Sequence, residues 1–152
     1  MSLPQPVPAR LWHVPQMTAI LWGFIHRTSW LPRVRPYRTD LHVMMQITRA
    51  GWVRIVRDWR GPVAFIARDG AMVHALYVHP RAQRCGMGRA LLEDAKRVQP
   101  RLELFVAEAN LPARAFYGAH DFAEVARSDG ANNDEGLPDI RMIWQQDRSA
   151  AP

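Results

Sequence analysis

A pair of glycines, Gly86 and Gly88, separates an apolar run at 71–78 from a helical pattern at about 86–99. A second apolar run follows at 102–107 and predicts another strand. A strand–helix–strand unit of this kind forms a right-handed crossover between two parallel strands of one sheet. Glycine at the turn indicates that the backbone bends sharply there or that another group approaches it closely. The unit therefore requires a sheet with a parallel pair, around which the other elements are arranged.

The flanking segments predict the remaining elements by their apolar periodicity and by their turn and cap residues. Further strands are expected at 10–14, 52–58, 63–68, 122–127 and 140–144. Further helices are expected at 15–30, at 39–51 with Thr39 or Asp40 as cap and Gly51 as stop, and from a cap at Asn110 to about Gly118. The Asp69-Gly70 hairpin sequence makes the strands before 79 an antiparallel meander. The order is β-α-α-β-β-β-α-β-α-β-β, an α/β fold with a mixed sheet covered by helices.

Length and composition indicate one globular domain. The chain has 152 residues, 48% of them hydrophobic, and a formal net charge of +6 that is almost entirely arginine. We expect flexible tails at 1–8 and 147–152 around a single domain at 9–146. Its one cysteine, Cys85, excludes an internal disulfide framework and a cysteine-based zinc site. Neither a membrane-spanning run nor a signal peptide is recognisable, so a cytoplasmic location is the expectation.

The glycine turn has the features of an anion site. Free N–H groups of a first helical turn and the helix dipole both favour a phosphate there, and Arg84 and Arg89 add positive charge. A Walker loop would need a Gly-Lys-Ser/Thr ending, and a dinucleotide fingerprint would need a third glycine where Leu91 stands. A tight helix entry without a ligand is the structural alternative.

The stretch "VHPRAQRCGMGRALLEDA" resembles the acetyl-CoA-binding motif of the GNAT family of N-acetyltransferases, Gln/Arg-x-x-Gly-x-Gly/Ala, with Gln83, Gly86 and Gly88 at its three positions. The stretch "VAEANLPARAFYGAHDF" is similar to the family's second cofactor segment, with Asn110 and Tyr117 in place. Asp121 departs from the glycine usual before the phenylalanine. The resemblance extends from about 60 to 144, and before that by topology.

The resemblance implies a GNAT-like, mostly antiparallel sheet with a central splayed parallel pair, and acetyl transfer from acetyl-CoA to a primary amine by direct attack in a ternary complex. It implies no metal. Tyr117 is then the general acid, and the Val78 N–H stabilises the oxyanion. His74, which should share Val78's face of the strand, is the candidate base. The implied cofactor contacts are Leu76, Tyr77, Val78, Gln83, Arg84, Cys85, Gly86, Met87, Gly88, Arg89, Asn110 and Tyr117.

Several alternatives stay open at this stage. A chain of water molecules could replace His74 as the base, Asn110 could be only a helix cap, and Tyr117 could serve packing alone. The protein could instead be a non-catalytic acyl-CoA sensor. A basic nucleic-acid-binding protein is the other alternative, because arginines concentrate at 31–60, but no binding motif accompanies them.

The acceptor is expected to be a small-molecule or peptide amine. It should enter between the first two helices and the acidic loop at 127–138, where Trp22, Phe24 and Trp30 could form an apolar pocket. The acidic residues Asp129, Asp134, Glu135 and Asp139 could attract a cationic amine, or could form only a solvated turn. Because dimers are common in this family, a homodimer is expected.

Overall fold

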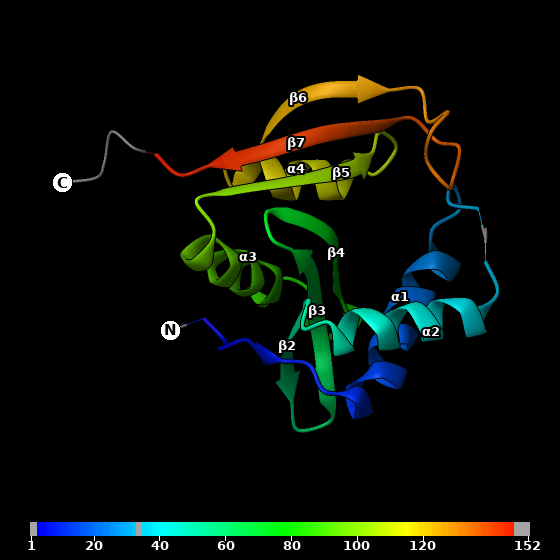
Figure 1. Ribbon diagram of the computed structural model, residues 1–152, viewed down its shortest axis with the longest axis vertical. Coiled ribbons are helices and arrows are strands. Elements are labelled where there is room, and N and C mark those ends of the chain that lie inside the picture. The colour runs from blue at the N-terminus through cyan, green and yellow to red at the C-terminus, as the bar shows by residue number, and fades with distance from the viewer. Residues whose placement is uncertain (1–2, 33–34, 148–152) are drawn as a thin grey trace.

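The structure is a computed structural model that describes residues 3–32 and 35–147. Its sheet has seven strands in the order β1-β2-β3-β4-β5-β7-β6 (Figure 1). The strands are β1 (Val7–Pro8), β2 (Val53–Asp58), β3 (Gly61–Asp69), β4 (Met72–Val78), β5 (Arg101–Ala107), β6 (Ala123–Ser128) and β7 (Asp139–Gln145). The helices are α1 (Val14–Arg27), α2 (Tyr37–Arg49), α3 (Met87–Val98) and α4 (Leu111–Ala119), with short 3-10 turns η1 (Leu11–His13) and η2 (Pro80–Ala82).

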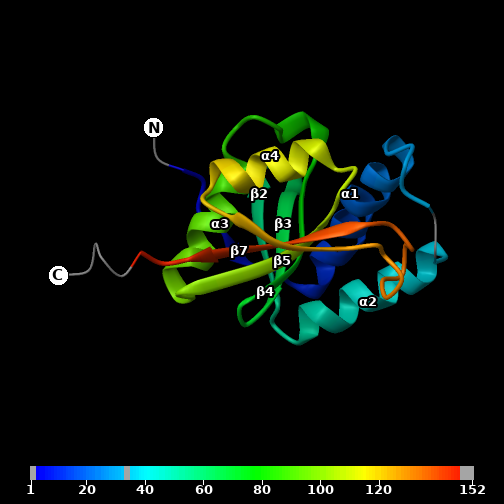
Figure 2. The same ribbon diagram turned by 90° about the horizontal axis from the view of Figure 1, so that it is seen from above.

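The predicted element order and fold class are confirmed. Every neighbouring pair of strands is antiparallel except β4 and β5, which are parallel and joined through α3. In both ribbon views β5 and β7 run across the direction of β3, so the sheet twists strongly where β4 meets β5 (Figures 1 and 2). Within the described part of the chain, the helices are too short or too polar to span a lipid bilayer.

Two clusters of buried side chains hold helices on opposite faces of the sheet. One cluster joins α3 and α4 to the sheet and includes Leu91 and Leu92, which are fully buried. The other joins α1 and α2 to β2 and β3 and includes Met17 and Phe65, both fully buried. This arrangement leaves the carboxyl end of β4 between the two helical layers, and the candidate site lies there.

The first strand is not where the sequence predicted it. Residues 11–13 form a 3-10 turn, and the strand is Val7–Pro8, within the range expected to be a tail, paired with Arg54 and Ile55 of β2. Proline is tolerated there because β1 is an edge strand. The His13 ring explains the turn, since its Nδ1 accepts a hydrogen bond from the Arg10 N–H at 2.9 Å. Residues 1–2 and 148–152 of the predicted tails lie outside the described residues.

The predicted cap of the second helix is also wrong. Helix α2 begins at Tyr37 after Pro36, and Asp40 lies inside the helix, buried. Its carboxylate accepts a hydrogen bond from the Trp22 indole at 2.9 Å and pairs with Arg35 at 3.3 Å. Asp40 therefore ties α2 to α1 instead of capping its own helix. The predicted stop at Gly51 is confirmed by its left-handed conformation, φ +81°.

Burial of His13 predicts a loss of stability in acid. Burial lowers the pKa of His13, and the nearby Arg57 and Arg10 lower it further. The unfolded chain therefore binds a proton at His13 more readily than the folded chain, so the free energy of unfolding should fall as pH drops below about 6.5. Urea unfolding between about pH 7.5 and 5.5 measures the effect. His13→Asn should flatten the pH dependence, whereas His42→Asn, on the exposed side of α2, should not.

Candidate functional site

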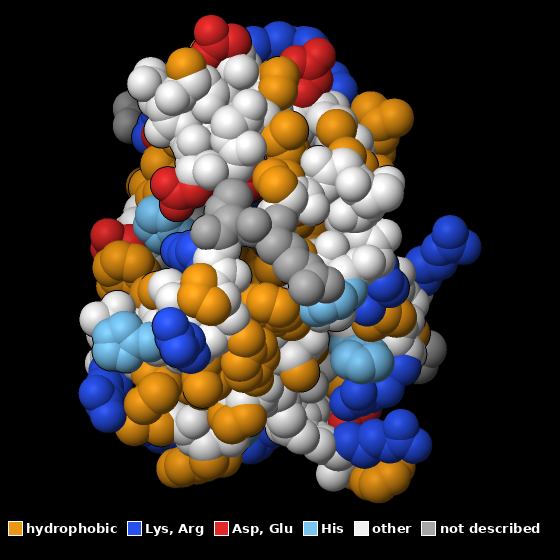
Figure 3. Space-filling view, turned by 90° about the vertical axis from the view of Figure 1, so that its right-hand side faces the viewer, with side chains coloured by type: hydrophobic (Ala, Val, Ile, Leu, Met, Phe, Trp, Pro, Cys, Tyr) orange, Lys and Arg blue, Asp and Glu red, His pale blue; other side chains and the backbone are white. Residues whose placement is uncertain are grey.

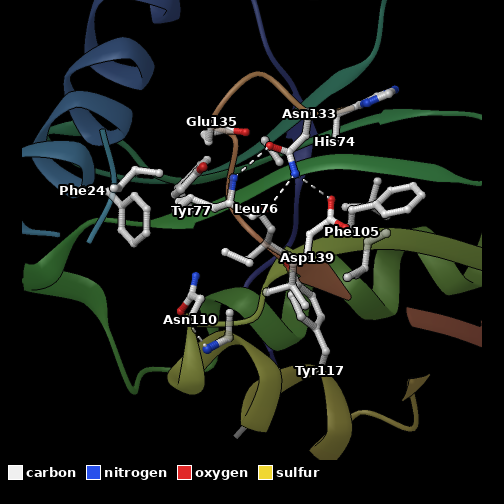
Figure 4. Close-up of a pocket in the computed structure, with 18 of the residues that line it drawn as sticks. Phe24, His74, Leu76, Tyr77, Phe105, Asn110, Tyr117, Asn133, Glu135 and Asp139 are labelled. Carbon is white, nitrogen blue, oxygen red and sulfur yellow. Dashed lines mark hydrogen bonds between the residues drawn. The ribbon is translucent and has the colours of Figure 1, made fainter. Parts of the chain in front are cut away.

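The parallel strands β4 and β5 pair only at their beginnings, Met72 with Glu103 and Val73 with Leu104. Beyond these positions the strands diverge, which confirms the expected splay. A cavity of about 650 Å³ opens there, between the rest of β4 and β5, with α4 on one side and the loop before β7 on the other (Figure 4). The divergence thus creates a deep site in the middle of an otherwise continuous sheet.

A β-bulge at His74 causes a change of face within β4. Ala67 of β3 pairs with Ala75, but the next residue, Arg68, pairs with Val73, so His74 has no partner in the ladder. Ala75 and Tyr77 consequently pack against the α1–α2 cluster, whereas Leu76 and Val78 pack against the α3–α4 cluster.

His74 therefore does not share Val78's face, and that prediction is wrong because it assumed an unbroken alternation of side chains. The His74 ring is exposed and stacks on Trp52, with ring centroids 5.4 Å apart. Trp52 packs against the α1–α2 cluster, so His74 lies on that side of the sheet. In Figure 4 its ring is directed away from the centre of the cavity.

The open edge of β4 presents backbone polar groups to the cavity. The His79 N–H donates to the Val63 carbonyl at 2.7 Å, so it faces β3. Because successive residues of a strand point their polar groups to opposite edges, the polar groups of Val78 and Leu76 face the divergent side and those of Tyr77 face β3. The Gln83 amide also reaches this edge and donates to the Val78 carbonyl at 3.4 Å.

The glycine loop has the backbone geometry of an anion site. Gly86 has φ +80° and caps α3, and Arg84 before it also has positive φ, +63°. No hydrogen bond between residues of the described ranges engages the N–H groups of 84–89. The side chains of Arg84, Cys85 and Arg89 are exposed around these groups. Met87 instead packs partly into the α3–α4 cluster.

The second glycine has a packing role. A Cβ atom at Gly88 would lie 2.9 Å from Cζ of Phe116, so only glycine lets α3 approach α4 this closely. Close packing against α4 therefore explains the glycine at position 88. The glycine at position 86 is explained instead by the positive φ of its backbone. Asp121, which departs from the family pattern, adopts the left-handed conformation that glycine would, with φ +73°.

Helix α4 brings Asn110 and Tyr117 to the cavity. The Asn110 Oδ1 accepts from the Ala113 N–H at 3.2 Å and caps the helix, while its amide nitrogen points toward the cavity (Figure 4). Tyr117 is 8% exposed, and its ring packs against Phe116 and Phe122. Burial raises the pKa of the Tyr117 phenol well above its usual value, so the group remains protonated at neutral pH.

The loop before β7 covers one side of the cavity, and hydrogen bonds between its own polar groups hold it in place. The Asn133 amide donates to the Leu137 carbonyl at 2.7 Å and to the Asp139 carboxylate at 3.3 Å, and the Ser128 hydroxyl donates to Asp139 at 2.8 Å. Asp139 and Glu135 both line the cavity, and Asp139 is also part of the scaffold of the loop (Figure 4). Asn133 was missed by the sequence analysis, since an asparagine in a polar loop gives no signal of its own.

The arginines at 31–60 do not form a uniform set of free cations. Arg33 lies outside the described residues. Arg35 pairs with Asp40, and Arg54 pairs with Asp94 at 2.6 Å. These pairs reduce the positive charge available to a nucleic acid.

Comparison with known proteins agrees with this geometry. The sequence model of the acetyltransferase (GNAT) family matches residues 12–122. The peptidyl-lysine N-acetyltransferase YjaB of Escherichia coli strain K12 is 33% identical over 110 residues, 71% of this chain and 75% of that protein. The solution structure of apo YjaB from Escherichia coli matches with a TM-score of 0.76 at 23% identity, over 96% of this chain and all of that one. YncA from Salmonella typhimurium, a putative acetyltransferase solved with acetyl-CoA, matches with a TM-score of 0.70 at 20% identity, over 99% and 98%.

The splayed parallel pair beside a glycine-capped helix agrees with the match to a family of acyltransferases. The chain belongs to the GNAT family of acetyltransferases, whose cosubstrate is acetyl-CoA. The residues present fit this group: the N–H groups of 84–89 suit its pyrophosphate, and the open edge at Leu76 and Val78 suits its amide-bearing arm.

Proposed function

We propose that this protein transfers the acetyl group of acetyl-CoA to a primary amine by direct attack within a ternary complex. The observation that carries the proposal is the open edge of β4, which has the glycine-capped N-terminus of α3 and the buried, protonated Tyr117 as neighbouring features of the site. These are the parts that such a transfer needs.

Binding is assigned to the loop and the two strand positions beside it. The N–H groups of 84–89 hold the pyrophosphate, and the exposed Arg84 and Arg89 supply counter-charge at the rim. Leu76 and Val78 pair with the pantetheine arm through their backbone polar groups, and the Asn110 amide nitrogen donates to the same arm. Tyr77, Gln83, Cys85, Met87 and Gly88 complete the surroundings of the cosubstrate.

Acetyl-CoA supplies an acyl carbon in a thioester. The amine nitrogen forms a bond to that carbon, the carbon–sulfur bond breaks, and the thiol sulfur takes the bonding electron pair. The Val78 N–H, facing the divergent edge, stabilises the negative charge on the carbonyl oxygen. The Tyr117 hydroxyl gives its proton to the departing sulfur, and its raised pKa keeps that proton available at neutral pH.

We assign His74 as the general base, which takes the proton of the attacking ammonium through a water molecule. His74 contributes to the walls of the main cavity and of a second cavity beside it, between α1 and α2. Because its ring points away from the cavity centre, a water molecule must connect the ammonium to the imidazole.

The acceptor enters from the side of α1 and α2, under the loop that carries Glu135. Relatives named as peptidyl-lysine N-acetyltransferases support an amine acceptor of this kind. Phe24 and Trp30, as expected, line the main cavity, and Trp22 lines the second one.

The test is release of free thiol from acetyl-CoA in the presence of an amine panel that includes alkylamines, arylalkylamines and a lysine peptide. We expect thiol release that depends on the amine and yields one acetylated product per thiol by mass spectrometry. Initial rates should give intersecting double-reciprocal lines, as a ternary complex requires. Parallel lines would instead indicate a covalent acetyl-enzyme, and the absence of amine-dependent release would overturn the proposal.

We further propose a cytoplasmic homodimer, with Trp12 and Trp59, which are 73% and 86% exposed and line neither cavity, as apolar surface for a second copy. Light scattering after size exclusion should give twice the chain mass of 17.4 kDa. A monomeric mass at micromolar concentration would contradict the dimer and leave the acetyl-transfer assay as the separate test of activity.

A further inference from the structure

A second cavity of about 360 Å³ lies between α1, α2 and the sheet. It shares part of its wall with the main cavity, so the two adjoin. The shared residues are Leu31, His74, Ala75, Tyr77 and Glu135. An acceptor whose nitrogen lies at this junction can therefore extend away from the thioester into the second cavity.

The walls of the second cavity are mostly apolar, with Arg35, Asp40, His74 and Glu135 as their charged or titratable members, and they reach into the core. These walls include Met44 and Phe65, which are 4% and 0% exposed, and the indoles of Trp22 and Trp52. A lysine side chain is an unbranched four-carbon stem on a backbone that must remain outside, so it would leave most of this volume without contacts. A ring-sized apolar group would fill it, as small-molecule ligands fill such pockets.

The charged groups are placed to orient such an acceptor. Both oxygens of the Asp40 carboxylate are engaged, one by the Trp22 indole and the other by Arg35. Within the described ranges Glu135, at the junction, has no ion pair, and its charge contributes to raising the pKa of Tyr77 to about 12 after the larger effect of burial. An ammonium group is therefore favoured at the junction and an uncharged body beyond it.

We infer that the acceptor is a free small amine with a compact aromatic or branched apolar body, held in the second cavity with its nitrogen beside Glu135. This inference rests on the proposed acetyl transfer and names its acceptor class. It distinguishes this chain from its relatives named as peptidyl-lysine enzymes, whose acceptor is carried on a protein.

Val43→Phe tests the inference, because Val43 lines only the second cavity, away from the junction. The probes are phenethylamine, ethylamine and a lysine peptide, each assayed for kcat/KM with saturating acetyl-CoA. In the wild type we expect phenethylamine to exceed both others by about 10-fold or more, which is the value of a ring in an apolar pocket. Val43→Phe should lower the ratio of phenethylamine to ethylamine by about the same factor. Val125→Phe, the same change on exposed β6, should keep the wild-type ratio.

A binding measurement tests the acceptor class separately from the proposed acetyl transfer. Phenethylamine is titrated calorimetrically into protein saturated with desulfo-CoA, and we expect binding that Val43→Phe weakens and Val125→Phe does not. Acetyl transfer that prefers the lysine peptide, or a Val43→Phe variant with an unaltered amine ratio, would overturn the acceptor class and leave the acetyltransferase intact. Failure of desulfo-CoA to bind at all would overturn both.

Discussion

Gly86→Glu is expected to abolish acetyl-CoA binding while leaving the protein folded. The new carboxylate would stand at the N-terminus of α3, among the N–H groups that are assigned to the pyrophosphate. Two like charges a few ångströms apart in a partly desolvated site cost about 3 kcal/mol, which weakens binding by about 100-fold or more. Calorimetric titration of acetyl-CoA and desulfo-CoA measures the loss directly.

The matched control for this change is Gly51→Glu. Gly51 has φ +81°, almost the same as Gly86 at +80°, and a Cβ atom there meets nothing within 4 Å. Both variants therefore place a residue at nearly the same positive φ and add the same charge. A Cβ atom at Gly86 would also lie 3.3 Å from Cδ2 of Leu3, and only Gly86 adjoins the candidate anion site. Equal loss of acetyl-CoA affinity in the two variants would show that strain, not the site, is responsible.

Tyr117→Phe is expected to lower kcat by about 100-fold with little effect on the KM for acetyl-CoA, since it removes only the proton donor. The phenylalanine ring keeps the contacts with Phe116 and Phe122, so the fold should not change. A thioester whose leaving group is a better, more acidic thiol needs less help from an acid. The deficit of Tyr117→Phe should therefore shrink with such an acyl donor.

Tyr37→Phe provides the comparison, because Tyr37 is 43% exposed on α2 and lies outside the main cavity. It should retain the wild-type kcat for both acyl donors. A Tyr117→Phe variant with wild-type kcat would remove tyrosine from the mechanism and favour proton transfer from solvent.

The elements with strong local signals were predicted correctly from the sequence. The hairpin at Asp69-Gly70, the glycine turn at Gly86 and the Asn110 cap all depend on the conformational preferences of one or two residues. The parallel crossover followed from the order of strand, helix and strand. These features need no information from distant parts of the chain.

Two of the errors arose where contacts between distant residues override a local pattern. Asp40 was expected at a helix cap, but its carboxylate bonds to Trp22 of another helix. His74 was placed by counting residues along a strand, and the count failed at a bulge that only the pairing with β3 reveals. The short apolar pattern at 10–14 fits a strand or a helical turn equally, and the His13 contact with the Arg10 N–H selects the turn.

Only two ladder pairs join β4 to β5, so the sheet consists of two parts, or leaves. One leaf contains β1 to β4 and the other contains β5, β7 and β6. The buried cluster under α3 contains residues of both leaves, such as Ile66 and Leu104, whereas the cluster under α1 and α2 contains residues of the first leaf alone. Backbone pairing therefore holds the two leaves together only at the start of β4, and the rest of their contact is made by side chains of the cluster under α3. Among the described residues no buried cluster joins the leaves on the side of α1 and α2, which is the side from which the acceptor is proposed to enter.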